Sequence, residues 1–163
     1  MKIKIWLIAF AIGFGPGLAF AADYKDWLPM FPKSLGGIAM SGKDDGVNST
    51  MSPMNTTVLS RTYGKKPGHV RLIAIWEPAG TQINLARAVL PMNINTNGTV
   101  MHAIKHQGYD GRYLYQPDQG VMIEVILSNA ALVRLEAPKG KNDEAKYTDM
   151  LKALNLKKLA TKM

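Results

Sequence analysis

The alternation of apolar and polar residues along the chain predicts six or seven short strands. The strongest of them is VRLIAIW at 70–76, because β-branched and aromatic residues fit a pleated sheet. Clusters of Gly, Pro, Asn and Asp separate the runs, as is typical of strands joined by turns. The predicted strands span residues 35–41, 56–63, 70–76, 99–106, 112–116, 121–127 and 132–136.

Two further segments repeat their apolar residues at the spacing of an α-helix. The first begins at Thr81, which caps it, and ends at Pro91. The second begins near Asn142 or Asp143 and has acidic residues in its first turn, where the helix dipole favours them. The apolar faces consist of Ile83, Ala86, Val89 and Leu90 in the first segment and of Tyr147, Met150, Leu151 and Leu154 in the second.

These elements predict one domain of the α+β class. Consecutive hairpins favour an antiparallel sheet of about six or seven strands, and we expect the two helices to cover one of its faces. Residues 42–55 are rich in Gly, Ser, Asn and Met, so we expect a polar loop between the first two strands. With 163 residues, 47% of them hydrophobic and 20% charged, the chain suits one folded domain and not a disordered state.

Residues 1–21 have the composition of a secretory signal peptide. Two lysines precede an apolar run, and small residues stand at the −3 and −1 positions of a cleavage site between Ala21 and Ala22. An uncleaved membrane anchor is the alternative, but the Gly-Pro-Gly sequence at 15–17 would interrupt so short a helix. We therefore expect a soluble mature domain of residues 22–163, without a membrane span, in the bacterial periplasm or secreted.

The chain contains no cysteine and has a formal net charge of +8. The lack of cysteine excludes disulfides, thiol nucleophiles, cysteine-ligated metals and lipid attachment at a lipobox. A positive field attracts anions, which in the periplasm would be lipopolysaccharide phosphates, anionic phospholipid headgroups or acidic glycans and not nucleic acid. The charge by itself favours a solubilising surface, and the alternative is a partner, either an envelope protein or an anionic envelope component.

Methionine and histidine residues are the candidate metal ligands. One group consists of Met101, His102 and His106, and Met51 and Met54 form an M-x-x-M pair in the predicted loop. Thioether and imidazole groups suit copper, which makes a periplasmic copper-binding protein an alternative function. The segment that holds the two histidines is predicted to form a strand, however, and residues four apart on a strand are separated by about 13 Å. We therefore favour ordinary surface histidines and no cofactor.

No catalytic motif is present in the chain. The patterns G-x-S-x-G, H-E-x-x-H, G-x-x-x-x-G-K-[ST] and S-x-x-K are all missing, so no catalytic residue is assigned. We favour a non-enzymatic binding protein associated with the envelope. If an open sheet face binds the partner, Trp76, Tyr113 and Tyr115 are candidate contacts. A hydrolase without a recognisable motif is the other alternative, and a pocket that joins His69 to a serine and an aspartate would support it.

Several short pieces of the chain carry a resemblance to other exported proteins. They are WLP at 27–29, LGG at 35–37, GYDGRY at 108–113 and LNLKKL at 154–159. On these pieces the chain resembles a loose group of small exported bacterial proteins of unestablished function. The resemblance implies a compact α+β periplasmic domain with a curved antiparallel sheet, and it implies nothing about catalysis.

Overall fold

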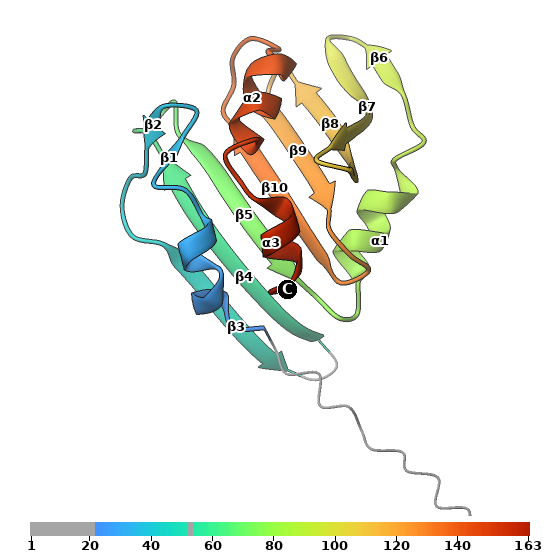
Figure 1. Ribbon diagram of the computed structural model, residues 1–163. Coiled ribbons are helices and arrows are strands. Elements are labelled where there is room, and N and C mark those ends of the chain that lie inside the picture. Colours follow the sequence, from blue (N-terminus) through green and yellow to red (C-terminus); the bar gives the residue numbers. More distant parts are fainter. Residues whose placement is uncertain (1–21, 52–53) are drawn as a thin grey trace, which may run out of the picture.

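Eight antiparallel strands form the sheet at the centre of the fold (Figure 1). The computed structural model describes residues 22–51 and 54–163, so the predicted signal peptide lies outside the described residues. The strands are β3 (Asp45–Met51), β4 (Met54–Tyr63), β5 (Val70–Trp76), β6 (Ile94–Thr96), β7 (Thr99–His106), β8 (Tyr109–Gln116), β9 (Gly120–Ile126) and β10 (Ala131–Ala137). Their order across the sheet is β3-β4-β5-β10-β9-β8-β7-β6, and the pairing of β10 with β5 joins its two halves.

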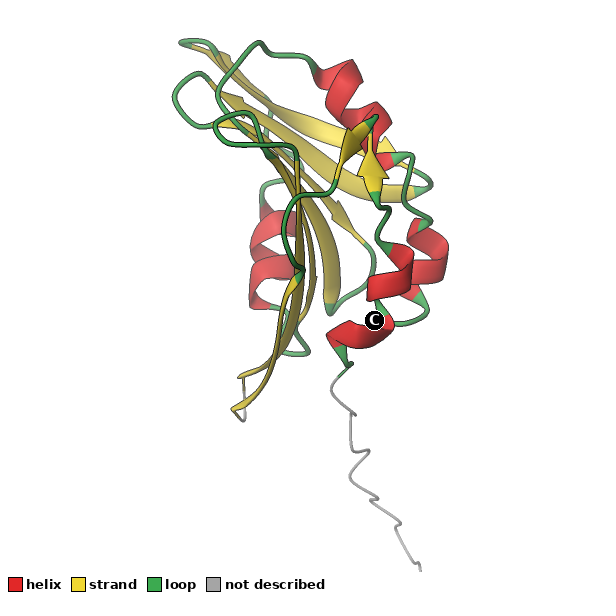
Figure 2. Cartoon of the chain, turned by 90° about the vertical axis from the view of Figure 1, so that its left-hand side faces the viewer, coloured by secondary structure: helices red, strands yellow, loops and turns green. Residues whose placement is uncertain are grey.

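Helices cover both faces of this sheet (Figure 2). The helices α2 (Glu144–Leu151) and α3 (Leu156–Ala160) lie on one face, which we call the inner face. The helix α1 (Thr81–Ala88) lies on the opposite face, which we call the outer face. The outer face therefore has one short helix to cover it, and much of that face is left open.

The sequence of β5 reflects this arrangement. Alternate residues from Val70 to Trp76 face the inner core, while Ile73 and Ile75 pack beneath α1 on the outer face. Because both faces of the strand are covered over most of its length, nearly every position is apolar. The exception is Arg71, an outer-face residue outside the cluster that packs on α1.

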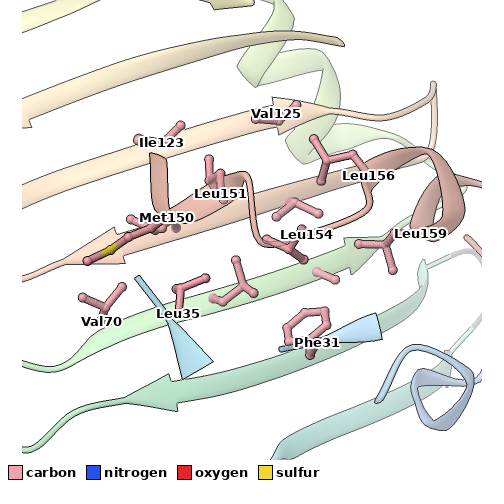
Figure 3. Close-up of a cluster of buried hydrophobic side chains, with 14 of the residues drawn as sticks. Phe31, Leu35, Val70, Ile123, Val125, Met150, Leu151, Leu154, Leu156 and Leu159 are labelled. Atoms are coloured by element: carbon pink, nitrogen blue, oxygen red, sulfur yellow. The ribbon is translucent and has the colours of Figure 1, made fainter. Parts of the chain in front are cut away.

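The main core lies between the inner face and the two carboxy-terminal helices (Figure 3). The apolar stripe predicted for the last helix is confirmed for Tyr147, Met150 and Leu151, which are buried in α2. Its fourth residue, Leu154, is also buried but lies between α2 and α3. Figure 3 shows Leu156 beside Val125 of β9, and Leu156 is one of the two buried residues of α3. These contacts place both helices against the middle of the sheet and leave its outer face to α1.

The predicted α+β class and antiparallel sheet are confirmed, but the numbers of strands and helices and the placement of the helices differ from the prediction. Three α-helices occur in the described part of the chain where two were expected, and the strand expected at 35–41 is instead a separate two-stranded sheet within residues 34–39. The main sheet has eight strands, and α1 covers the face opposite to α2 and α3. Most of the expected loop at 42–55 is β3 and the first residues of β4. An edge strand with largely exposed side chains needs no apolar alternation, so its polar sequence is indistinguishable from that of a loop.

The amino-terminal segment is fixed to the inner face by Arg61 of β4. Its Nη2 lies 2.7 Å from Asp44 Oδ2, and its Nη1 donates to the carbonyl oxygens of Phe31 and Pro32. The Tyr63 hydroxyl also donates to Pro32 O, at 2.8 Å. The segment consists of the 3-10 turns η1 (Tyr24–Asp26) and η2 (Leu28–Met30) and the two-stranded sheet of β1 (Ser34–Leu35) and β2 (Ile38–Ala39).

The first described residue is already attached to the domain. The Ala22 carbonyl oxygen accepts a hydrogen bond of 2.6 Å from the hydroxyl of buried Thr57. The Trp27 indole nitrogen donates to the carbonyl oxygen of Lys162, 3.1 Å away, which ties this segment to the carboxy-terminus. Within the described residues, no helix has the length and apolar character needed to cross a membrane.

Candidate binding groove on the outer face

The outer face of the sheet is divided into bands that run across the strands. One band is apolar and packs on α1 through Ile75, Ile126 and Leu132. The next band along the strands is charged, and the band after it contains two adjoining hollows. The alternation of side chains along each strand creates these bands, because residues in register on neighbouring strands share a face.

The charged band, which we call the charged row, consists of Arg134, Glu124 and Arg112, directly opposite one another on β10, β9 and β8. The Glu124 side chain is only 1% exposed. Its Oε2 accepts from Arg112 Nε at 2.6 Å, and its Oε1 accepts from Arg134 Nε at 2.8 Å. A carboxylate this well buried is tolerable because two guanidinium groups replace its water. The charged row therefore separates the α1 contact from the open part of the face.

The next row contains Arg71, Glu136, Met122 and Leu114, again directly opposite one another, on β5, β10, β9 and β8. Glu136 is shared between two cations, because its Oε2 lies 3.3 Å from Arg71 Nη1 and its Oε1 lies 3.8 Å from Arg134 Nη1. The row is charged at its β5 end and apolar at its β8 end. It forms the floor of the hollows.

The two hollows meet at this row. The first, of about 190 Å³, is lined by Leu114 and Met122, and the second, of about 210 Å³, is lined by His69 and Arg71. Gln119, Glu136 and Ala137 line both of them. We call the combined depression the end groove and define it by His69, Arg71, Leu114, Gln119, Met122 and Glu136.

Gly120 positions the turn that borders the end groove. It has a φ of 103°, a backbone conformation that L side chains rarely adopt. A Cβ atom at this position would also collide with the Ala137 carbonyl oxygen and with Pro138. The turn between β8 and β9 can approach the end of β10 only because residue 120 is glycine, and this approach makes Gln119 a wall of both hollows.

Arg71 in the end groove has spare bonding capacity. The Arg71 side chain is 43% exposed, and both of its contacts are long, at 3.3 Å to Glu136 and 3.4 Å to Ser60 Oγ. The Nδ1 atom of His69 is buried, and no hydrogen-bond partner for it occurs among the described residues. This nitrogen has almost no accessible surface, so a ligand in the end groove can bond to Arg71 but not to His69 Nδ1.

Basic side chains gather at the same end of the sheet. The turn at 64–69 precedes β5 and the loop at 138–143 follows β10, and these antiparallel neighbours bring the two connections to one end (Figure 1). The connections carry Lys65, Lys66, Lys139 and Lys141. In the part of the chain that the structure describes, none of the four forms an ion pair. The end groove therefore lies at the end of the sheet that carries these lysines, together with Asp118 of the β8–β9 turn and Asp143 of the second connection.

A larger hollow, of about 470 Å³, lies beside α1 between Arg87, Leu90, Asp110 and Ile126. Its charged groups already have partners. Arg87 Nη1 donates to Asn129 Oδ1 at 2.7 Å, and Asp110 Oδ1 lies 3.6 Å from the amino group of Lys105. This hollow therefore offers a ligand fewer free polar groups than the end groove does.

The predicted metal ligands lie on different faces of the sheet. Met101 is buried on the outer face, opposite Leu114, whereas His102 and His106 lie on the inner face. Met51 and Met54 are backbone partners at the end of the β3–β4 hairpin, and their side chains lie outside the described atoms. The structure thus brings Met51 close to Met54 but does not bring Met101 together with either histidine. Among the described residues, no group of three His, Asp or Glu side chains is arranged to hold a metal.

Each of the two histidines has its own structural contacts. His102 Nε2 lies 3.1 Å from Glu144 Oε1, and its ring lies 5.5 Å from that of Tyr113. Burial raises the pKa of the Tyr113 hydroxyl to about 12, and the nearby charge of Glu144 adds to the effect. His106 is 4% exposed, and burial lowers its pKa. Both residues connect β7 to α2.

The structure does not place the predicted aromatic contacts on the open face, and the hollow at His69 does not have the lining that a hydrolase would need. Trp76 and Tyr113 are buried in the inner core, and the hydroxyl of Tyr115 donates to Gly140 O at 3.0 Å, so the three do not lie on the open face. The hollow that contains His69 is lined by neither serine nor aspartate. The condition that would have supported a hydrolase is therefore not met at His69.

The groove residues were not singled out by sequence reasoning. Arg71, Leu114, Met122 and Glu136 lie far apart in the chain, and only strand register makes them neighbours. The one available signal was Arg71, a lone charge inside an apolar strand. Comparison of the chain with protein-family models, with curated proteins and with solved structures gave no match.

Proposed function

We propose that this protein is exported to the periplasm and acts there as a non-catalytic binding protein for an anionic component of the cell envelope, which it holds at the end groove. The leader-like composition of residues 1–21 and the resemblance to small exported bacterial proteins support export. The observation that carries the binding role is the charge balance of the groove. Glu136, the carboxylate in its lining, is already shared by Arg71 and Arg134, while the lysines of the two connections at this end of the sheet have no ion-pair partners among the described residues.

The physical basis is electrostatic steering followed by short-range bonding. Exposed lysines raise the concentration of anions near the groove but hold them weakly, since water and salt screen them. The Arg71 guanidinium is a planar donor that suits carboxylate and phosphate groups. In a partly enclosed hollow this bond is stronger than on an open surface.

Vesicle binding by purified residues 22–163 tests the binding role. We expect the domain to sediment with vesicles of phosphatidylglycerol, and not with phosphatidylcholine, and to be released as salt rises from about 0.05 to 0.5 M. The double variant Lys139→Gln with Lys141→Gln should bind several-fold more weakly. The matched control is Lys157→Gln with Lys158→Gln on α3, which removes the same charge away from the groove. If the control loses binding as strongly as the groove variant, a diffuse positive surface and not the end groove is responsible.

Fractionation tests export. We expect the full-length gene product to yield a periplasmic chain whose first residue is Ala22, because cleavage is predicted after Ala21. Recovery of the intact 163-residue chain from the cytosol would overturn the proposed compartment and the choice of partner.

A further inference from the structure

We propose that the end groove binds a single-chain carboxylate amphiphile, a molecule of the fatty-acid class, with its carboxylate at Arg71 and its alkyl chain over Met122 and Leu114. This inference rests on the proposed function, because it names the ligand of the same groove. It starts from the floor of the groove, which changes from charged to apolar along one row of the sheet.

The polarity of the floor follows from strand register. Arg71 and Glu136 supply its charged half, and Met122 and Leu114 supply its apolar half. On the next strand the row continues with Met101, which is 6% exposed and opposite Leu114. Sulfur-containing and branched side chains make an adaptable surface for an alkyl chain. A ligand that satisfies the whole row must therefore be polar at one end and apolar at the other.

The dimensions of the row suit a chain of moderate length. Neighbouring strands are spaced by about 4.8 Å, so three steps from β5 to β8 separate the two ends of the floor by about 14 Å. The two hollows together hold a slim ligand, and each is too small for a bulky ring system. A two-chain phospholipid does not fit inside them, so the inferred occupant is a single chain.

The head group is inferred from the charges that face it. Arg71 provides the donors, and Glu136 brings one negative charge into the same lining. A carboxylate is a monoanion that can accept from the Arg71 guanidinium. A phosphate monoester would bring up to two negative charges beside Glu136. A cationic head group would meet Arg71 and would be repelled.

Titration calorimetry on residues 22–163 tests this inference directly. The probe is decanoate below its aggregation concentration, and the comparison ligands are acetate, hexanoate, decyl phosphate and decyltrimethylammonium. We expect one decanoate per chain, an affinity that rises from acetate to hexanoate to decanoate, weaker binding of decyl phosphate and none of decyltrimethylammonium.

Variants assign the two ends of the ligand. Arg71→Gln should weaken decanoate binding about tenfold or more while leaving the gain from hexanoate to decanoate intact. Leu114→Gln should reduce that chain-length gain. The matched controls are Arg87→Gln and Leu85→Gln on α1, which make the same chemical changes outside the groove and should leave the affinity within about twofold of the parent. Circular dichroism of each variant shows whether it is folded, and the chain-length series on the parent domain is decisive even if Leu114→Gln fails to fold.

Each outcome bears on the inference. Equal binding of decanoate and decyltrimethylammonium, or full affinity of a folded Arg71→Gln domain, overturns it. If the domain sediments with anionic vesicles but does not bind decanoate, the single-chain ligand is wrong and the proposed function stands. If it binds neither, both proposals fall.

Discussion

The carboxylate of Glu124 lies between the guanidinium groups of Arg112 and Arg134, 2.6 Å from Nε of the first and 2.8 Å from Nε of the second. The three residues come from three neighbouring strands, so this one side chain links β8, β9 and β10 across the outer face. Its burial is possible only because both cations are in place.

Removal of the Glu124 carboxylate should therefore destabilise the domain strongly. Glu124→Ala leaves Arg112 and Arg134 partly buried without their shared partner, and we expect the free energy of unfolding to fall by about 3 kcal/mol. Urea denaturation measures the change. The control is Glu144→Ala, whose side chain is 42% exposed and pairs with His102, and which should cost less than about 1 kcal/mol. Similar losses in the two variants would mean that the charged row contributes little.

Substitutions at Gly120 and Gly108 test whether the turn that borders the end groove requires glycine for its close approach to β10. Both have positive φ values, 103° and 87°, but a Cβ atom at residue 108 meets nothing within 4 Å, whereas one at residue 120 would collide with backbone. We expect Gly108→Ala to cost about 1 kcal/mol through conformational strain alone. Gly120→Ala should cost about 2 kcal/mol more, because the turn must also move away from β10. Thermal unfolding of both variants checks the difference, and equal costs would show that the close approach is not required.

His106 should make the domain sensitive to mild acid. Burial lowers its pKa in the folded state, so the unfolded chain takes up a proton first as the pH falls. The stability of the domain is then fully present above the ordinary histidine pKa of about 6.5 and declines as the pH drops below it. Lys152, Asp149 and the backbone of Leu151 are the neighbours that act on this group.

The measurement is the urea midpoint between pH 7.5 and 5 for the parent and for His106→Gln. The variant should depend less steeply on pH over this range because it cannot take up the proton. An unchanged slope would assign the acid sensitivity to other groups.

The copper hypothesis can be tested through Met101. Because Met101 lies on the outer face and the two histidines lie on the inner face, we expect Met101→Leu to leave any copper affinity of residues 22–163 unchanged. Leucine is close to methionine in volume, so the fold should be preserved. Copper titration followed by fluorescence provides the measurement. Loss of stoichiometric binding in this variant would restore a site that includes Met101.

The local pattern of apolar residues was sufficient to predict several elements that bury at least one face. The alternation or apolar density of β5, β9 and β10 predicted their strands, and the stripe at Tyr147, Met150 and Leu151 predicted α2. It failed for β3, where an edge strand with exposed polar residues has no apolar signal. It also placed α1 on the same face as the last helix, which is wrong, because an amphipathic helix can pack on either face of a sheet with apolar residues on both.

The order of residues by itself determined the α+β class, the antiparallel hairpins, the absence of thiol chemistry and the excess of positive charge, because each is a local or additive property of the chain. The tertiary structure alone decided that Arg71, Glu136, Met122 and Leu114 share one row, since that depends on the pairing of β5 with β10 across 55 or more residues and on the register of every hairpin between. A shift of one residue in any of these pairings would turn a groove residue to the opposite face, which is why no local pattern could have located the groove.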